Sequence, residues 1–410
     1  MQKDCVNEVN EMIRVLVADD SAFMRKVLGD LFSRQPDFEL VGTALNGRDA
    51  ISKVKEQRPD LMTMDVNMPV MNGLDALAVI MKECPLPVVM LSSLTQEGTE
   101  ATIQALSLGA VDFISKAGGS ISSIDTIEEE ILSKCRNAAR AHVQPIVMAK
   151  EPPAALPVKK RIELSTRHGL RPPTTSKEPT SAHAVRLARR ENPLLKKRSP
   201  LPDGMNKLNI IPAAGSETRP AGCRLVAVGT STGGPQALQR VIVQLPADLP
   251  CGVVVVQHMP AGFTKALADR LNSISRIAVK EAEDGELIRP GHVYIAPGGY
   301  HLRVEARQTS MYICLGQDPP VGNHRPAVNV MYDSVASLGR QLVAVIMTGM
   351  GSDGCEGMKK IKAAGGYSIA QDEATCVVYG MPKVVVEAGL ADEVCPVQDI
   401  ARAIVKAVRR

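Results

Sequence analysis

The sequence predicts two doubly wound α/β domains, each built on a parallel sheet, joined by a long flexible linker. Short apolar runs alternate with helical stretches in both halves of the chain. These Val/Ile/Leu runs are continuous, which is typical of strands buried on both faces in a parallel sheet. Between the halves, residues 141–222 hold fifteen Lys/Arg against six Asp/Glu, a net charge of +9, and are rich in proline. That composition predicts a basic linker, so we place the domains at 12–135 and 223–410.

Composition places the chain among cytoplasmic globular proteins. It has 410 residues, of which 45% are hydrophobic and 22% charged, enough for two cores. No apolar run reaches the roughly 18 residues of a membrane span, and the first residues lack the apolar core of a signal peptide. The nine cysteines are scattered without a C-x-x-C pair. We therefore expect no membrane insertion, no disulfide framework and no structural zinc.

In the first domain, five apolar runs predict five parallel strands with crossover helices. The strands are expected at 14–18, 40–44, 61–64, 87–91 and 111–114, with helices such as 22–34 and 47–56 between them.

Polar side chains follow these strands. Asp19 and Asp20 come after the first strand and Asp65 after the third, while Ser92 ends the fourth and Lys116 follows the fifth. Carboxylates that converge at one sheet edge repel one another unless a cation binds, and an oxygen-only set suits Mg²⁺. Asp65 is then a candidate phosphoryl acceptor, with Ser92 and Lys116 contacting the phosphoryl oxygens. The alternative for Asp19 and Asp20 is capping of the next helix.

In the second domain, three apolar runs end in the residue types of a catalytic triad. The run 224–230 leads into Ser231, the run 252–257 into His258, and the run 342–349 into a loop with Asp353. Parallel sheets bind ligands at the carboxyl ends of their strands. If the strands are neighbours, these residues converge as nucleophile, general base and orienting carboxylate.

Other interpretations remain open for this second site. A glycine-rich turn before a helix is also compatible with a phosphate or dinucleotide site, although neither common nucleotide motif is present. His324, in a loop, is a rival general base, and a substrate-contacting role suits it as well. His292 and His301 flank the expected strand 293–297 and suggest structural roles. Capping of the helix expected at 354–364 is the alternative for Asp353.

The motifs of both domains resemble one known family. Residues 15–21 (VLVADDS), 64–73 (MDVNMPVMNG) and 115–116 (SK) are similar to the response-regulator receiver domain. Residues 229–235 (GTSTGGP), 257–260 (QHMP), 324–326 (HRP), 348–354 (TGMGSDG) and 371–376 (QDEATC) resemble the chemotaxis methylesterase CheB. The resemblance implies a flavodoxin-like receiver domain, with a five-stranded parallel sheet, followed by a mostly parallel α/β esterase domain.

The resemblance also implies roles for individual residues. Asp65 matches the phosphorylated aspartate, and Asp19, Asp20 and the Asn67 main-chain carbonyl match the metal site. Ser231, His258 and Asp353 match the catalytic triad, and the Met350 main-chain N–H matches the oxyanion hole. The esterase site is expected to use no cofactor.

The family hydrolyses glutamyl methyl esters on chemoreceptors, releasing methanol, and deamidates receptor glutamines. It is activated through phosphorylation by the chemotaxis histidine kinase. Two features depart from the family: Ala117 stands where receiver domains usually have proline after the lysine, and the linker is long.

Two other classes of protein compete with this interpretation. In the first, the linker of a transcriptional regulator binds nucleic acid. No helix-turn-helix pattern follows the first domain, and the chain has no Trp and 3% aromatic residues, so we expect no DNA binding. In the second, the second domain is a non-catalytic adaptor. The intact set of Ser, His and Asp favours an enzyme.

Overall fold

The computed structural model describes residues 12–93, 95–116, 124–141, 143, 223–307 and 310–409. Nearly all of the predicted linker, and Ala117, lie outside the described residues. Within the described ranges, no helix is long and apolar enough to cross a membrane.

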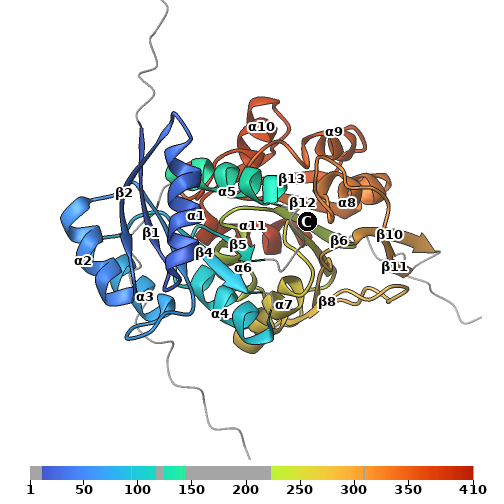
Figure 1. Ribbon diagram of the computed structural model, residues 1–410. Helices are drawn as coiled ribbons and strands as arrows, with labels where there is room; N and C mark the ends of the chain where they lie inside the picture. The colour runs from blue at the N-terminus through green and yellow to red at the C-terminus, as the bar shows by residue number, and fades with distance from the viewer. Residues whose placement is uncertain are drawn as a thin grey trace, which may run out of the picture. The chain divides into compact units, whose positions relative to one another are not determined.

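The N-terminal domain is a five-stranded parallel sheet in the order β2-β1-β3-β4-β5 (Figure 1). Its strands are β1 (Ile13–Ala18), β2 (Phe38–Ala44), β3 (Leu61–Asp65), β4 (Val88–Ser93) and β5 (Asp112–Lys116), and its helices are α1 (Ala22–Ser33), α2 (Gly47–Gln57), α3 (Gly73–Glu83), α4 (Gln96–Ser107) and α5 (Ile124–Ala139). The predicted strands and helices agree with these to within a few residues.

The alternating side chains of β1 pack against helices on both faces of this sheet. Val15 and Val17 lie in one core with α1 and α5, and Leu16 and Ala18 in the other with α2, α3 and α4. Because both faces are covered, the strand is apolar throughout. The strand order reverses between β1 and β3, so the polar residues that follow these two strands meet at one edge.

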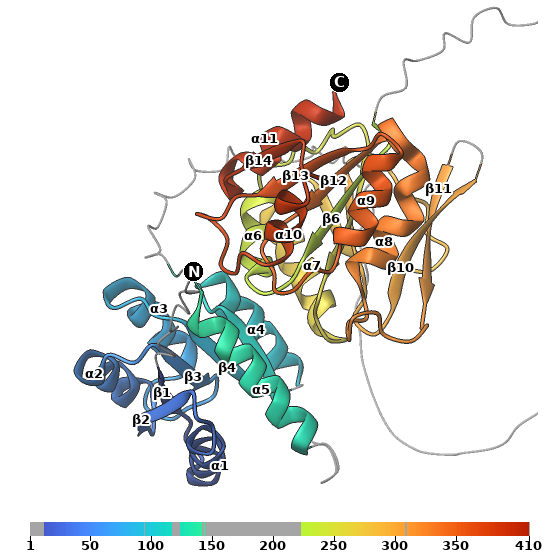
Figure 2. The same cartoon turned by 90° about the horizontal axis from the view of Figure 1, so that it is seen from above.

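The C-terminal domain contains a seven-stranded parallel sheet in the order β14-β13-β12-β6-β7-β9-β8. Figure 2 shows β14, β13, β12 and β6 of this sheet. Its strands are β6 (Leu225–Thr230), β7 (Gly252–Gln257), β8 (Ala278–Glu281), β9 (His292–Ile295), β12 (Leu342–Ile346), β13 (Tyr367–Gln371) and β14 (Glu393–Cys395). An antiparallel hairpin adds β10 (His301–Arg307) and β11 (Ser310–Gly316). The helices are α6 (Gly234–Ile242), α7 (Phe263–Ile274), α8 (Val328–Val335), η2 (Ala336–Gln341, a 3₁₀ helix), α9 (Cys355–Ala363), α10 (Met381–Glu387) and α11 (Val397–Val408).

Two cores cover the two faces of this sheet. On β6, Val226 and Val228 face the core formed with α6, α7 and α11. Leu225 and Ala227 face the core formed with α8, α9, α10 and the hairpin, and α8 lies beside α9 (Figure 2). The strand order reverses between β6 and β12. This places the loops after β6, β7 and β12 at one edge of the sheet.

Candidate active site and phosphorylation site

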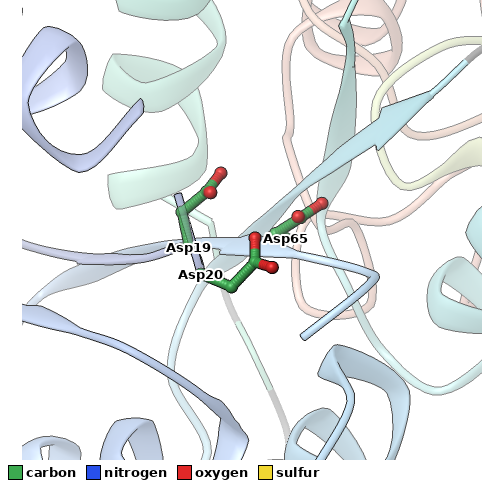
Figure 3. Close-up of side chains that lie close together, drawn as sticks. All are labelled: Asp19, Asp20 and Asp65. Atoms are coloured by element: carbon green, nitrogen blue, oxygen red, sulfur yellow. The ribbon is translucent and has the colours of Figure 1, made fainter. Parts of the chain in front are cut away.

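Three carboxylates gather where β1 and β3 end (Figure 3). One oxygen from each of Asp19, Asp20 and Asp65 lies within 4.8 Å of the others. Asp19 and Asp65 are buried, whereas Asp20 is exposed. The two strands are hydrogen-bonded neighbours, so their carboxyl ends bring these side chains together.

Lys116, at the end of β5, neutralises part of this charge. Its Nζ lies 2.9 Å from Asp19 Oδ2 and 3.0 Å from Asp65 Oδ2. Burial raises the pKa of Asp65, and Lys116 opposes part of that rise. Burial also disfavours the Lys116 ammonium, but the two aspartates outweigh it and raise the pKa of this lysine. Lys116 is therefore a fixed cation at the predicted phosphoryl position.

Capping does not account for Asp19 and Asp20, because the residue that caps α1 is Ser21, whose side chain accepts from the Met24 N–H. Asp19 instead accepts a hydrogen bond from the Ser21 N–H at 2.9 Å.

Two further predicted residues lie at the ends of β3 and β4. Ser92 is buried at the end of β4, where its hydroxyl donates to Gly98 O at 3.0 Å and accepts from the Thr102 hydroxyl at 2.5 Å. The Asn67 main chain, two residues past Asp65, hydrogen-bonds to the Asp65 carboxylate.

The donor set at this edge is suited to Mg²⁺. It consists of oxygen ligands only, and the mixture of buried and exposed carboxylates leaves room for the waters that Mg²⁺ retains. Asp19, Asp20 and Asp65 would bind the ion. When bound, it would neutralise charge on an incoming phosphoryl group.

In the C-terminal domain, Ser231 directly follows β6, and the loop after β12 helps to hold its main chain. The Ser231 N–H donates to Thr348 O at 3.0 Å, and Gln257 Nε2 donates to Ser231 O at 2.9 Å. Ser231 is 8% exposed. Gly233, two residues later, has φ = 76°, a value that favours glycine and allows the chain to turn directly into α6.

His258 links Ser231 to Asp353. Its Nε2 lies 2.8 Å from Asp353 Oδ2, and its Nδ1 lies 3.1 Å from Ser231 Oγ. An ionised carboxylate only accepts hydrogen bonds, so Nε2 holds the proton and donates to Asp353. Nδ1 then accepts from the Ser231 hydroxyl, as a general base does.

Asp353 lies against the N-terminus of α8. Its carboxylate accepts from the Val328 N–H at 2.6 Å and from the Asn329 N–H at 2.9 Å. Burial alone would raise the pKa of Asp353, but His258 and these two N–H groups outweigh it and hold the pKa below its ordinary value. The sequence suggested capping of the following helix. The structure shows a cap on a different helix, α8, whose N-cap residue Ala327 has no capping side chain.

Gly349 lets the loop after β12 approach the nucleophile. A Cβ at this position would lie 2.8 Å from Ser231 Cβ and 2.3 Å from Met381 Sδ. Among the described residues, no protein acceptor receives the N–H of the next residue, Met350. This N–H is therefore available for an oxyanion.

Sequence reasoning missed the contact between His258 and His324. The two rings are stacked, with centroids 3.8 Å apart and planes 9° apart. His292 and His301, for which the sequence suggested structural roles, each contact a main-chain carbonyl. His301 is fully buried with Nε2 3.1 Å from Pro319 O, and His292 Nδ1 lies 2.9 Å from Pro290 O. No local pattern indicated the stacking, because it depends on where a distant loop folds.

Comparison with known proteins assigns both domains to families. The model of the CheB methylesterase family matches residues 226–404, and that of the response regulator receiver domain matches residues 15–127. A protein-glutamate methylesterase/protein-glutamine glutaminase of Symbiobacterium thermophilum is 46% identical over 404 residues, which cover 98% of this chain and 99% of the relative. The chain belongs to the CheB methylesterase family.

A second curated relative matches over nearly the whole chain, and a solved structure matches the C-terminal domain. A protein-glutamate methylesterase/protein-glutamine glutaminase of Pyrococcus horikoshii is 42% identical, with 97% of this chain and 94% of the relative covered. The crystal structure of the Thermotoga maritima CheB methylesterase catalytic domain is 48% identical, covers 45% of this chain and 99% of its own, and has a TM-score of 0.45. The two family models and the two curated relatives confirm the predicted family and enzyme class. They do not favour an adaptor or a nucleic-acid binder.

Proposed function

We propose that this CheB chain is a phosphorylation-regulated protein-glutamate methylesterase and glutaminase in which Ser231, His258 and Asp353 perform the chemistry. The main support is the unbroken hydrogen-bonded series from Ser231 through His258 to Asp353, at 3.1 and 2.8 Å. It lies at the sheet edge where ligands bind in this architecture.

In this mechanism, the Ser231 oxygen attacks the carbonyl carbon of a glutamyl methyl ester while His258 Nδ1 takes the hydroxyl proton. Asp353 stabilises the imidazolium that forms, and the Met350 N–H donates to the oxyanion. The carbon–methoxy bond breaks, and His258 returns its proton to the leaving methoxy oxygen. A water molecule, deprotonated by His258, then hydrolyses the acyl-enzyme to glutamate. A glutamine side chain follows the same steps with ammonia as the leaving group.

We also propose that Asp65 accepts the phosphoryl group from the chemotaxis histidine kinase, in the cytoplasm. Asp19, Asp20 and the Asn67 carbonyl, together with Asp65, would hold Mg²⁺. Lys116 and Ser92 would contact the phosphoryl oxygens. The support is the position of Lys116 Nζ, 3.0 Å from Asp65 Oδ2. The substrates are methyl-accepting chemoreceptors, and the esterase chemistry described above requires no cofactor.

Methanol release from methylated chemoreceptor membranes tests the assignment of Ser231. Ser231→Ala should retain the fold and lose ester turnover, because no other group replaces the nucleophile. Loss of a triad residue elsewhere leaves on the order of 10³–10⁴-fold catalysis over water. Ser273→Ala, at an exposed position on α7, is the matched control and should be as fast as the wild type. Turnover by a folded Ser231→Ala variant at the rate of the control would exclude Ser231 as nucleophile.

A further inference from the structure

His324 covers one face of the general base. Its ring lies nearly parallel to the His258 ring, with an angle of 9° and centroids 3.8 Å apart. The edge of the His258 ring is occupied by its two hydrogen bonds, through Nδ1 to Ser231 and Nε2 to Asp353. These bonds leave the ring free to tilt about the line between them. A stacked ring opposes that tilt.

The loop that presents His324 is fixed by main-chain contacts. Val321 and His324 exchange two main-chain hydrogen bonds of 3.1 Å, with positive φ at Gly322 (59°) and Asn323 (66°) between them. This is the geometry of a tight two-residue hairpin turn, for which Gly and Asn are favoured. The position of the His324 Cα is therefore determined by the turn.

The rest of this loop is attached to the domain by Arg325. Its Nη1 donates to Gln317 O at 3.0 Å and Asp318 O at 3.1 Å. The Gly299 N–H donates to the Arg325 carbonyl at 3.0 Å. Contacts on both sides keep His324 in place, which a residue that supports another side chain requires.

The His324 ring is neutral near pH 7. Burial, followed by the neighbouring His258, lowers its pKa to about 4, and Asp353 opposes this only in part. A neutral ring does not repel the imidazolium that forms on His258 when it takes the serine proton. A second cation at this distance would disfavour that imidazolium.

We propose that His324 is a positioning residue: its ring stacks on His258 and keeps that imidazole in the plane where it faces both Ser231 and Asp353. This rests on the proposed function, because it takes His258 as the general base. It differs from the sequence-based expectations of His324 as rival base or substrate contact, because it rests on the contact between the face of the His324 ring and the His258 ring. The proposed positioning role therefore requires a flat ring at position 324.

Steady-state methanol release by full-length His324 variants tests the proposal. His324→Phe retains a flat ring and should keep kcat within about threefold, since the ring stacking is preserved. His324→Leu, of similar size but not flat, should lower kcat roughly 10- to 100-fold with little change in KM, because small misplacements of a catalytic group have effects of that size. His324→Asn should behave like His324→Leu, and it provides the comparison if the Leu variant does not fold.

The control pair is His292→Phe and His292→Leu, at a histidine that also lies near an aromatic ring, Tyr294, but belongs to β9. Both should retain wild-type kcat. The proposal is overturned if folded His324→Leu or His324→Asn keeps wild-type kcat, if only KM changes, or if His324→Phe is as slow as the Leu variant. An active Ser231→Ala would instead refute the proposed function. An inactive Ser231→Ala beside a fully active His324→Leu would refute the positioning role alone.

Discussion

The charge of Asp353 depends on three donors that come from different parts of the domain. Its carboxylate accepts from His258 on the loop after β7 and from two N–H groups at the start of α8. A helix N-terminus favours a negative charge. The ionised form of Asp353 is therefore stabilised by the fold, and it in turn fixes the tautomer of His258.

Replacing Asp353 by Asn should strongly impair catalysis, because Asp353 holds the proton of His258 on Nε2. In one orientation the amide would present its NH₂ group to His258 Nε2 and the Val328 N–H, and in the other to the Asn329 N–H, so one of these donors always loses its acceptor. In both orientations the neutral amide would no longer stabilise the imidazolium of His258. We expect kcat to fall by about 10³–10⁴, as in the corresponding change of a serine-protease triad. The measurement is methanol release, with Asp333→Asn as the control. Asp333 pairs with Lys360 at 2.7 Å on the exposed side of α8. Equal rates for the two variants would contradict this role.

The same substitution should change how stability depends on pH. An aspartate in the unfolded chain has a pKa of about 3.9, and in the folded protein the pKa of Asp353 lies below its ordinary value. Its ionised form thus contributes stability above about pH 4, and this contribution is lost as the pH falls through the folded pKa. Thermal unfolding from neutral to acid pH should show a smaller acid destabilisation for Asp353→Asn than for the wild type. If the stability of the variant and of the wild type fell equally with pH, the claim that Asp353 is ionised in the folded protein would be refuted.

At the scale of elements, the site depends on how closely the loop after β12 approaches the end of β6. Gly349 has no room for a side chain beside Ser231. The two strands are hydrogen-bonded in register from Leu225↔Leu342 to Gly229↔Ile346, so the loop cannot move away without disturbing the sheet. The position of the nucleophile is set by strand pairing and by this glycine.

Gly349→Ala should therefore impair catalysis more than stability alone explains. Its Cβ would push on Ser231 and Met381, and overpacking of this kind costs about 1–3 kcal/mol. A displaced nucleophile should lower kcat roughly 100-fold. Gly389→Ala is the control: φ is 67° and no atom lies within 4 Å of the added Cβ, so it should cost stability through the backbone without changing kcat. Wild-type kcat in a folded Gly349→Ala variant would show that this contact does not position Ser231.

Strand positions could be predicted from the sequence because buried parallel strands are apolar along their whole length. The same rule placed Asp19, Asp65, Ser231 and His258 at strand ends, since they directly follow such runs. The cap on α8 and the stacking of His324 could not be predicted. Both join segments that are distant in the sequence, and Ala327 gives no local capping signal. The contacts that orient the site residues are thus tertiary, whereas the residues proposed to react follow local patterns in the sequence.

At the scale of the whole molecule, each of the two doubly wound sheets has a candidate site at its carboxyl edge. In the first, β1 and β3 bring carboxylates together, and in the second, the loops after β6, β7 and β12 bring together Ser231, His258 and Asp353. Each site lies where the strand order reverses. The central claim is that phosphorylation at Asp65 controls ester turnover at Ser231.

The most direct test of this claim is the initial rate of methanol release by the full-length chain, with and without a small-molecule phosphodonor and Mg²⁺. Wild type should accelerate with both present, and a chelator should abolish the gain, because three carboxylates need the ion to accept a phosphoryl group. Asp65→Asn should stay at the basal rate, while Asp75→Asn, at an exposed position on α3, should accelerate like the wild type. If Asp65→Asn is activated as strongly as the wild type, Asp65 is not the switch and the account is wrong.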